Sequence, residues 1–292
     1  MKNSKEKRQK FIWYATASII ILILFFVWEA LLMKGIIVFP QIINFGFIGF
    51  RTYGILITIG VALLTYIINR EKKHIKKIKK VDMADLLIFT LFGGILGARL
   101  YHLATDWRLY AANPISALYF WNGGLGIFGA IVGGILALLL YSKFKKFDLF
   151  TMIDLIAVFM PLAQIVGRAG NLVNQEIVGL PTTLPWSWKL ANLSTTFHPV
   201  FLYEQIGDLL LFVLLFWFYK TKKVIGNLDL TLIYLAGYSV VRFIVEFWRS
   251  EPKIIFSTFT LNQAVCVFVI IFSVIVYRFR YKLLKLNKEY DL

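Results

Sequence analysis

The stretch G-R-A-G-N-L-V-N-Q-E-I-V-G, residues 167–179, follows a largely apolar run, 148–166, that is long enough to cross a bilayer. It brings a guanidinium, three amides and a carboxylate to the end of that run: Arg168, Asn171, Asn174, Gln175 and Glu176. Polar groups at membrane depth are costly and usually face a cavity where a substrate binds. The stretch therefore predicts a membrane protein with its functional site here. The alternative is a snorkelling arginine at a helix end, followed by a polar loop.

The composition supports a membrane protein over a soluble one. The chain has 292 residues, of which 59% are hydrophobic, and its mean hydropathy is +0.72. The net charge of +16 would favour nucleic-acid binding in a soluble protein. Here the basic residues form blocks that alternate with loops poor in Lys and Arg, which is the positive-inside pattern. We therefore expect no nucleic-acid partner and assign these blocks to the cytoplasm: 2–10, 70–80, 143–146, 220–223 and 278–288.

The apolar runs predict an all-α polytopic membrane protein with about eight helices and both termini in the cytoplasm. We expect spans near 11–33, 47–69, 84–105, 121–143, 148–166, 200–220, 228–249 and 260–277. Residues 11–33 exceed the apolar region of a typical signal peptide, so we predict a retained helix. The domain organisation that follows is a basic leader with an extra helix (1–43), a membrane domain (44–282) with an outer-face segment (167–200), and a cytoplasmic tail (283–292).

This topology places the unusual polar residues at the outer ends of their helices. Tyr238, Arg242, Glu246 and Arg249 are spaced by four, four and three residues, so we expect them to share one helical face. Arginine binds phosphate bidentately and keeps its charge when partly buried. Several arginines beside carboxylates at one depth therefore favour recognition of an anionic headgroup at the outer leaflet. The alternative is an internal Arg242–Glu246 pair that only stabilises the bundle.

Other chemistries have little support in the sequence. Cys266 is the only cysteine, which excludes a disulfide or a cysteine metal site within one chain. We see no metal cluster, nucleotide loop or nucleophilic serine motif, and we expect no metal and no cofactor. Gly93 and Gly97 have the spacing that lets membrane helices approach closely. A phosphate ester held by arginines in a dry site is primed to leave, and the acceptor could be a thiol, a hydroxyl or an amine.

Five segments together resemble the prolipoprotein diacylglyceryl transferases of bacteria. The first is G-R-A-G-N-L-V-N-Q-E-I-V-G-L-P-T, which begins at Gly167. The others are T-Y-G-I-L (52–56), G-G-I-L-G-A-R (93–99), F-H-P-V-F-L-Y-E (197–204) and G-Y-S-V-V-R-F-I-V-E-F-W-R (237–249). The resemblance covers roughly residues 44–282, with the motifs in the family's order.

The resemblance implies a multi-pass enzyme of the bacterial cytoplasmic membrane. Such an enzyme transfers the diacylglyceryl group of phosphatidylglycerol to the lipobox cysteine of a prolipoprotein signal peptide, forming a thioether and releasing glycerol phosphate. By matching position, Arg168 and Arg242 would hold the phosphate. Asn171 and Glu176 would shape the site, and Tyr53 and Tyr238 would line it. Further substrate-binding residues would be Arg99, Asn174, Gly179, His198, Tyr203, Glu204, Glu246 and Arg249.

The sequence departs from the family's pattern in two places. Phe128 stands where some members carry a histidine proposed as the base, which leaves Glu204, Glu176 or His198, or activation of the thiol by cations alone. Residues 1–33 add a helix to the family's usual seven. An anion or lipid transporter and a non-catalytic lipid-binding homologue stay as alternatives, and the sequence does not indicate an oligomeric state.

Overall fold

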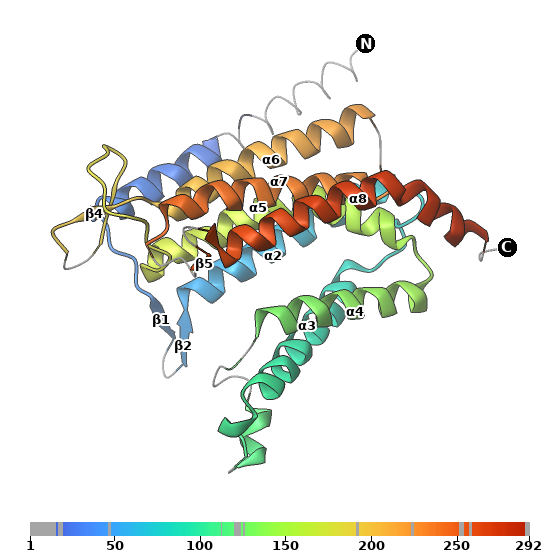
Figure 1. Cartoon of the computed structure of the whole chain (residues 1–292), viewed down its shortest axis with the longest axis horizontal. Coiled ribbons are helices and arrows are strands. Elements are labelled where there is room, and N and C mark those ends of the chain that lie inside the picture. Colours follow the sequence, from blue (N-terminus) through green and yellow to red (C-terminus); the bar gives the residue numbers. More distant parts are fainter. Residues whose placement is uncertain are drawn as a thin grey trace. The chain divides into compact units, whose positions relative to one another are not determined.

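The computed structural model describes residues 16, 20–45, 48–111, 113–119, 124, 126–190, 193–222, 225–250, 254–256 and 259–289. Within this part of the chain, seven helices are long and apolar enough to cross a membrane. This confirms the prediction of a polytopic helical membrane protein (Figure 1). The helices are α2 (Thr52–Glu71), α3 (Met83–Thr105), α4 (Ile127–Lys145), α5 (Leu149–Asn174), α6 (Val200–Lys222), α7 (Asp229–Val245) and α8 (Leu261–Glu289).

The first predicted span, 11–33, is only partly described. Its described part is the apolar helix Ile20–Met33, which is shorter than the seven spanning helices. Most of 11–19 lies outside the described residues, so an eighth span and the cytoplasmic termini stay predictions. Among the described residues, short 3-10 helices lie between the larger elements: η1 (Lys72–His74), η2 (Trp107–Leu109), η3 (Pro114–Leu118) and η5 (Glu246–Trp248).

The prediction of a helix from residue 47 was wrong at its start. Strand β1 (Ile42–Phe45) pairs with β2 (Ile48–Arg51) in an antiparallel hairpin, and α2 begins only at Thr52. The N–H of Thr52 donates to the carbonyl of Gln41 at 2.8 Å, so the hairpin fixes the first turn of α2. Tyr53 follows directly and is thereby held at a defined position.

Helix α5 is longer than expected, because it continues past Val166 to Asn174. The expected outer-face segment therefore begins inside a helix, and Arg168 lies well before the helix end. The helix ends where Gln175 and Ile177 adopt positive φ values of 54° and 60°. These left-handed residues turn the chain sharply, as at many helix C-termini.

Two short strand pairs lie in the described part of the chain after α5. Strand β3 (Trp188–Lys189) pairs with β4 (Thr196–Phe197), and β5 (Ile254–Phe256) pairs with β6 (Phe259–Thr260). Helix α7 ends at Val245, so Glu246 lies in η5 and Arg249 is extended. The predicted single helical face therefore ends before Arg249.

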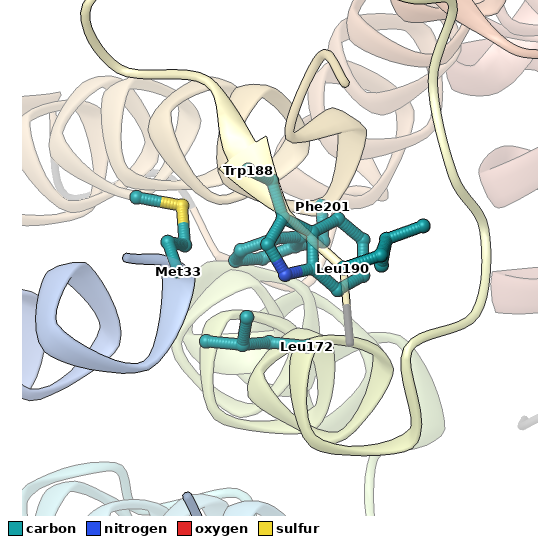
Figure 2. Packing of buried hydrophobic residues seen from close by; sticks show 5 residues of the cluster. All are labelled: Met33, Leu172, Trp188, Leu190 and Phe201. Carbon is teal, nitrogen blue, oxygen red and sulfur yellow. The ribbon is translucent and has the colours of Figure 1, made fainter. Parts of the chain in front are cut away.

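The fold divides into two compact units. Unit 1 contains residues 1–60, 161–211 and 237–271, and unit 2 contains 61–160, 212–236 and 272–292. A buried hydrophobic cluster in unit 1 consists of Met33, Leu172, Trp188, Leu190 and Phe201. Figure 2 shows Met33 and Leu172 beside the Trp188 and Phe201 rings, whose centroids are 5.2 Å apart. This cluster ties the helix Ile20–Met33 to α5, β3 and α6.

Unit 2 contains the close pair α3 and α4. An added methyl group at Gly93 would lie 2.9 Å from the carbonyl oxygen of Gly133, and one at Gly97 would lie 2.9 Å from the Cα of Gly133. The predicted packing role of both glycines is confirmed. Asp82 caps α3 by accepting from the N–H groups of Ala84 and Asp85 at 2.8 and 3.2 Å. These backbone donors lower the pKa of Asp82.

Candidate active site

Unit 1 brings together five charged side chains from α5, α6, α7 and η5, which we call the arginine–glutamate network: Arg168, Glu204, Arg242, Glu246 and Arg249. Glu204 forms ion pairs with Arg168 and, at 2.9 Å between Oε1 and Nη1, with Arg242. Arg242 Nη2 lies 2.8 Å from Glu246 Oε2, and Arg249 Nη1 lies 3.7 Å from the same oxygen. Both glutamates thus connect two arginines each.

The carboxylates and the guanidiniums of this network differ in exposure. The Glu204 and Glu246 side chains are 1% and 0% exposed, whereas those of Arg168, Arg242 and Arg249 are 21%, 14% and 22% exposed. The carboxylates therefore form the buried layer, and the guanidiniums keep accessible edges. Three guanidiniums and two carboxylates leave one positive charge in excess within the network. Such an arrangement presents positive charge to an anion rather than neutralising it internally.

Further polar side chains, from β6 and the first turn of α8, fix the Glu246 carboxylate. Its Oε1 accepts from Asn262 Nδ2 at 2.8 Å and from the Thr260 hydroxyl at 3.2 Å. Thr260 is itself positioned by its N–H, which donates to Gln263 Oε1 at 3.0 Å. The sequence analysis did not identify these residues. The polar side chains in T-L-N-Q, residues 260–263 at the start of an apolar helix, were the feature that could have indicated them.

The Arg168 guanidinium has two neighbours that the sequence predicted. Its Nη2 donates to the Tyr238 hydroxyl at 3.1 Å, and its Nη1 donates to Asn171 Oδ1 at a long 3.5 Å. Asn171 Nδ2 in turn donates to Glu176 Oε1 at 3.4 Å, and Asn174 Nδ2 donates to the same oxygen at 3.2 Å. The turn after α5 therefore returns Glu176 toward the residues of the last helical turns.

Tyr53 packs against α5 in the same region. An added methyl group at Gly170 would overlap the Tyr53 ring, so the missing side chain makes room for that ring two residues after Arg168. The sequence-predicted association of Tyr53 with the stretch 167–179 is thus present in unit 1.

Gly179 is the point where three backbone segments meet. Leu180 N donates to Trp248 O at 2.8 Å, and His198 N donates to Leu180 O at 2.9 Å. Gly179 itself pairs with Arg249 in an isolated β-bridge. A methyl group at Gly179 would lie 2.5 Å from His198 O and 2.9 Å from Trp248 O, so only glycine allows this approach.

An apolar hollow of about 490 Å³ lies beside this junction in unit 1. His198 Nδ1 and Trp186 Nε1 lie 2.8 and 3.1 Å from the Tyr203 hydroxyl at its polar end. Its other lining residues include Ile206, Leu210, Val241, Ile244 and Trp248. The predicted residues His198 and Tyr203 therefore line an aliphatic space that is suited to a hydrocarbon chain.

Arg249 has the electrostatic character expected of a partly buried cation. Burial lowers its pKa, the positive charge of Arg242 lowers it further, and Glu246 opposes this change. Arginine is by far the most basic side chain, so the guanidinium stays charged at neutral pH.

One expected site residue, Arg99, lies in unit 2, and so does Phe128, which stands where some family members carry a histidine. Arg99 donates through Nε, Nη2 and Nη1 to the carbonyl oxygens of Ala117, Ser116 and Gly124 at 2.7, 2.9 and 3.0 Å. Its guanidinium also lies 4.8 Å from the centroid of the Tyr110 ring. Phe128 contacts the Tyr101 ring. The expectation that Arg99 binds substrate stays a prediction. Residues 121–123, at the start of the expected span 121–143, lie outside the described residues.

Asp208 is a buried carboxylate that the sequence analysis overlooked. It lies one helical turn after Glu204 and is fully buried. Neither of its carboxylate oxygens has a hydrogen-bond partner among the described residues. Arg168 is the positive group that acts on it electrostatically. The spacing of four between two acids inside an apolar helix was the available signal.

Fold and site together define a polytopic membrane protein in which partly exposed arginines are paired with buried carboxylates. The family model described as "Prolipoprotein diacylglyceryl transferase" matches residues 40–279. The chain belongs to the prolipoprotein diacylglyceryl transferase family.

Curated relatives agree with this assignment. One from Lactobacillus acidophilus is 31% identical over 264 residues, which cover 87% of this chain and 94% of the relative. One from Fervidobacterium nodosum is 36% identical over 238 residues (78% and 80%). One from Clostridioides difficile is 39% identical over 199 residues (68% and 78%). All three are named phosphatidylglycerol–prolipoprotein diacylglyceryl transferase.

Proposed function

We propose that the arginine–glutamate network is the active site at which this chain transfers the diacylglyceryl group of phosphatidylglycerol to a prolipoprotein. The chain is a transferase by its family, and the relatives' names give both substrates. The observation that carries the site is the difference in exposure between buried Glu204 and Glu246 and the accessible guanidiniums. Arg168 and Arg242 hold the phosphate of phosphatidylglycerol, and Glu204 fixes the distance between them.

The acceptor is the thiol of the lipobox cysteine. Its sulfur attacks the glyceryl carbon of the diacylglyceryl group, the S–C bond forms, and the C–O bond to the phosphate breaks. The electron pair of that bond leaves with glycerol phosphate. The two arginines stabilise the negative charge that develops on the departing phosphate, and this electrostatic effect lowers the barrier. The hollow lined by Ile206, Leu210 and Val241 accommodates an acyl chain.

The thiol must lose its proton before or during this attack. Glu204 is a poor acceptor, because its carboxylate is buried and paired with two arginines. Glu176 is exposed and held by two amide donors beside Arg168. We therefore propose that Glu176 accepts the proton of the cysteine thiol, with His198 as the alternative acceptor. The positive charge nearby favours the thiolate form of the cysteine.

We also propose a membrane and an orientation for this enzyme. The enzyme acts in the bacterial cytoplasmic membrane, and the network opens toward the outer leaflet. The alternation of basic blocks supports this orientation. The prolipoprotein signal peptide then reaches the site from the side on which lipoproteins are displayed.

The test measures the mass of a lipobox peptide after incubation with the purified protein and phosphatidylglycerol micelles. The wild-type protein adds a diacylglyceryl mass that is absent when the peptide thiol is blocked. Arg168→Ala loses at least about a hundredfold in rate, as expected for removal of one electrostatic stabiliser. Arg108→Ala is the matched control, because Arg108 is exposed and lies in η2 of unit 2. Bound lipid without a mass gain in the wild type would favour transport or binding.

A further inference from the structure

The helix Ile20–Met33 lies before residue 40, where the match to the family model begins. It is nevertheless an integral part of unit 1. Met33 belongs to the hydrophobic cluster shown in Figure 2. Lys34 Nζ donates to the carbonyl of Pro185 at 2.6 Å. Glu29, one turn before Met33, is 1% exposed and faces the interior of the unit.

Glu29 reaches α6 through a single amide. Gln205 Nε2 donates to Glu29 Oε1 at 2.7 Å and to the carbonyl of Ile165 at 2.9 Å. Gln205 is fully buried. One NH₂ group therefore uses both of its hydrogens to connect the helix Ile20–Met33, α6 and α5.

On both α5 and α6, the residues that make these contacts are close in sequence to residues of the proposed active site. Gln205 directly follows Glu204, and Ile165 precedes Arg168 by three residues. Glu204 and Arg168 form the ion pair that links α6 to α5. The Gln205 amide therefore fixes the relative position of α5 and α6 within about one turn of that ion pair.

The hydrogen bonds of Glu29 and Gln205 indicate whether the Glu29 side chain is a carboxylate or a neutral carboxyl group. Glu29 Oε2 and Gln205 Oε1 have no hydrogen-bond partner among the described residues. A carboxylate would leave an uncompensated charge there, which is strongly unfavourable. A neutral carboxyl group avoids this charge and still accepts the hydrogen bond from Gln205 Nε2 through Oε1.

We propose that Glu29, as a neutral acid bonded to Gln205, is a positioning residue that holds Glu204 and Arg168 in register for phosphatidylglycerol. The extra helix is then a working part of this transferase rather than a detached anchor. This inference rests on the proposed role of the arginine–glutamate network.

The experiment compares Glu29→Gln, which keeps a hydrogen-bonding neutral group, with Glu29→Leu, which has a similar size but no polar atom. Kinetics are measured with phosphatidylglycerol and the lipobox peptide varied separately, alongside thermal stability. Glu29→Leu is expected to lower kcat/KM for phosphatidylglycerol about tenfold and to raise its KM, with the KM for the peptide unchanged. Glu29→Gln keeps at least half of the wild-type value. Ile23→Ala, on the exposed face of the same helix, is the control.

A merely structural role would lower only the fraction of folded enzyme, so kcat would fall with stability while both KM values stayed constant. That result, or wild-type kinetics in Glu29→Leu, would overturn the proposal, as would loss of activity in Glu29→Gln without loss of stability. Phosphatidylglycerol binding to the same variants in nanodiscs gives a second readout, independent of turnover, with the same tenfold difference expected. Arg168→Ala is measured in the same series to separate the proposed active site from the proposed role of Glu29. Full activity of the Arg168→Ala protein would reject the arginine–glutamate network as the active site, whatever the Glu29 variants show.

Discussion

Arg168 and Arg99 are both arginines in apolar helices, yet the two units use them differently. In unit 2, Arg99 directs three of its donor atoms to backbone carbonyls around a loop. In unit 1, Arg168 and Arg242 are held from behind by the buried Glu204 and keep accessible edges. We propose that the three backbone carbonyls make Arg99 part of the loop's structure, whereas buried Glu204 orients Arg168 and Arg242 for an external anion. The comparison predicts that the contacts of an arginine, and not only its depth in the membrane, decide its role.

The largest expected effect comes from Glu204→Gln. Removing this carboxylate leaves Arg168 and Arg242 close together without the charge that joins them, so activity should fall at least about a hundredfold. Breaking a buried ion pair also costs about 3–5 kcal/mol of stability. Rate and thermal stability are measured on the same preparation.

Arg99→Gln is the corresponding substitution in unit 2. It removes donors from three carbonyls of unit 2, so we expect a lower thermal stability and a loss of activity at least tenfold smaller than that of Glu204→Gln. An equal loss of activity in a stable Arg99→Gln protein would break the comparison and place Arg99 among the substrate-binding residues.

Gly179→Ala should have an intermediate effect. The new methyl group meets His198 O and Trp248 O, so the strand contact that positions Arg249 must open. We expect about a tenfold fall in kcat/KM for phosphatidylglycerol. Gly134→Ala is the matched control, since its methyl group would only reach Thr90 O at 3.9 Å. Unchanged kinetics for Gly179→Ala would show that the junction does not support the network.

The smallest effect concerns Asp106, at the end of α3 in unit 2. The Thr105 hydroxyl, and next His102 at 2.9 Å, hold the pKa of Asp106 below its usual range. A lowered pKa means that the stabilisation is present above the unfolded value of about 3.9 and is lost as the pH falls through the folded value. Asp106→Asn should therefore lower thermal stability slightly at pH 7 and leave it unchanged well below pH 3.9. If the wild type and Asp106→Asn still differ in thermal stability in acid, the effect comes from hydrogen bonds rather than from charge.

Several features of the fold could be predicted from local sequence. The cap at Asp82, the packing of Gly93 and Gly97, and the Arg242–Glu246 pair all depend on neighbours within a few residues or on small side chains. Residues 48–51 were assigned to a helix, because an apolar strand and an apolar helix segment have the same composition. The apolar run predicts a helix that ends at Val166, but α5 continues to Asn174 through the polar stretch.

The charged residues of the arginine–glutamate network could be predicted from the sequence, but the contacts between distant parts of the chain could not. The types and spacing of Arg168, Arg242 and Glu204 indicated an anion site. Only the fold shows that Glu204 joins the two arginines, which are 74 residues apart in sequence, since 242 − 168 = 74. The contact between Glu29 and Gln205 spans 176 residues and has no periodic signal.

The central claim is that Arg168 and Arg242 hold the phosphate of phosphatidylglycerol. A structure of the protein with bound phosphatidylglycerol, determined in nanodiscs, tests it most directly. The account predicts the phosphate within hydrogen-bond distance of both guanidiniums, with Glu204 still bridging them from the buried side. A phosphate bound at Arg99, with Arg168 and Arg242 contacting only their glutamates, would contradict it.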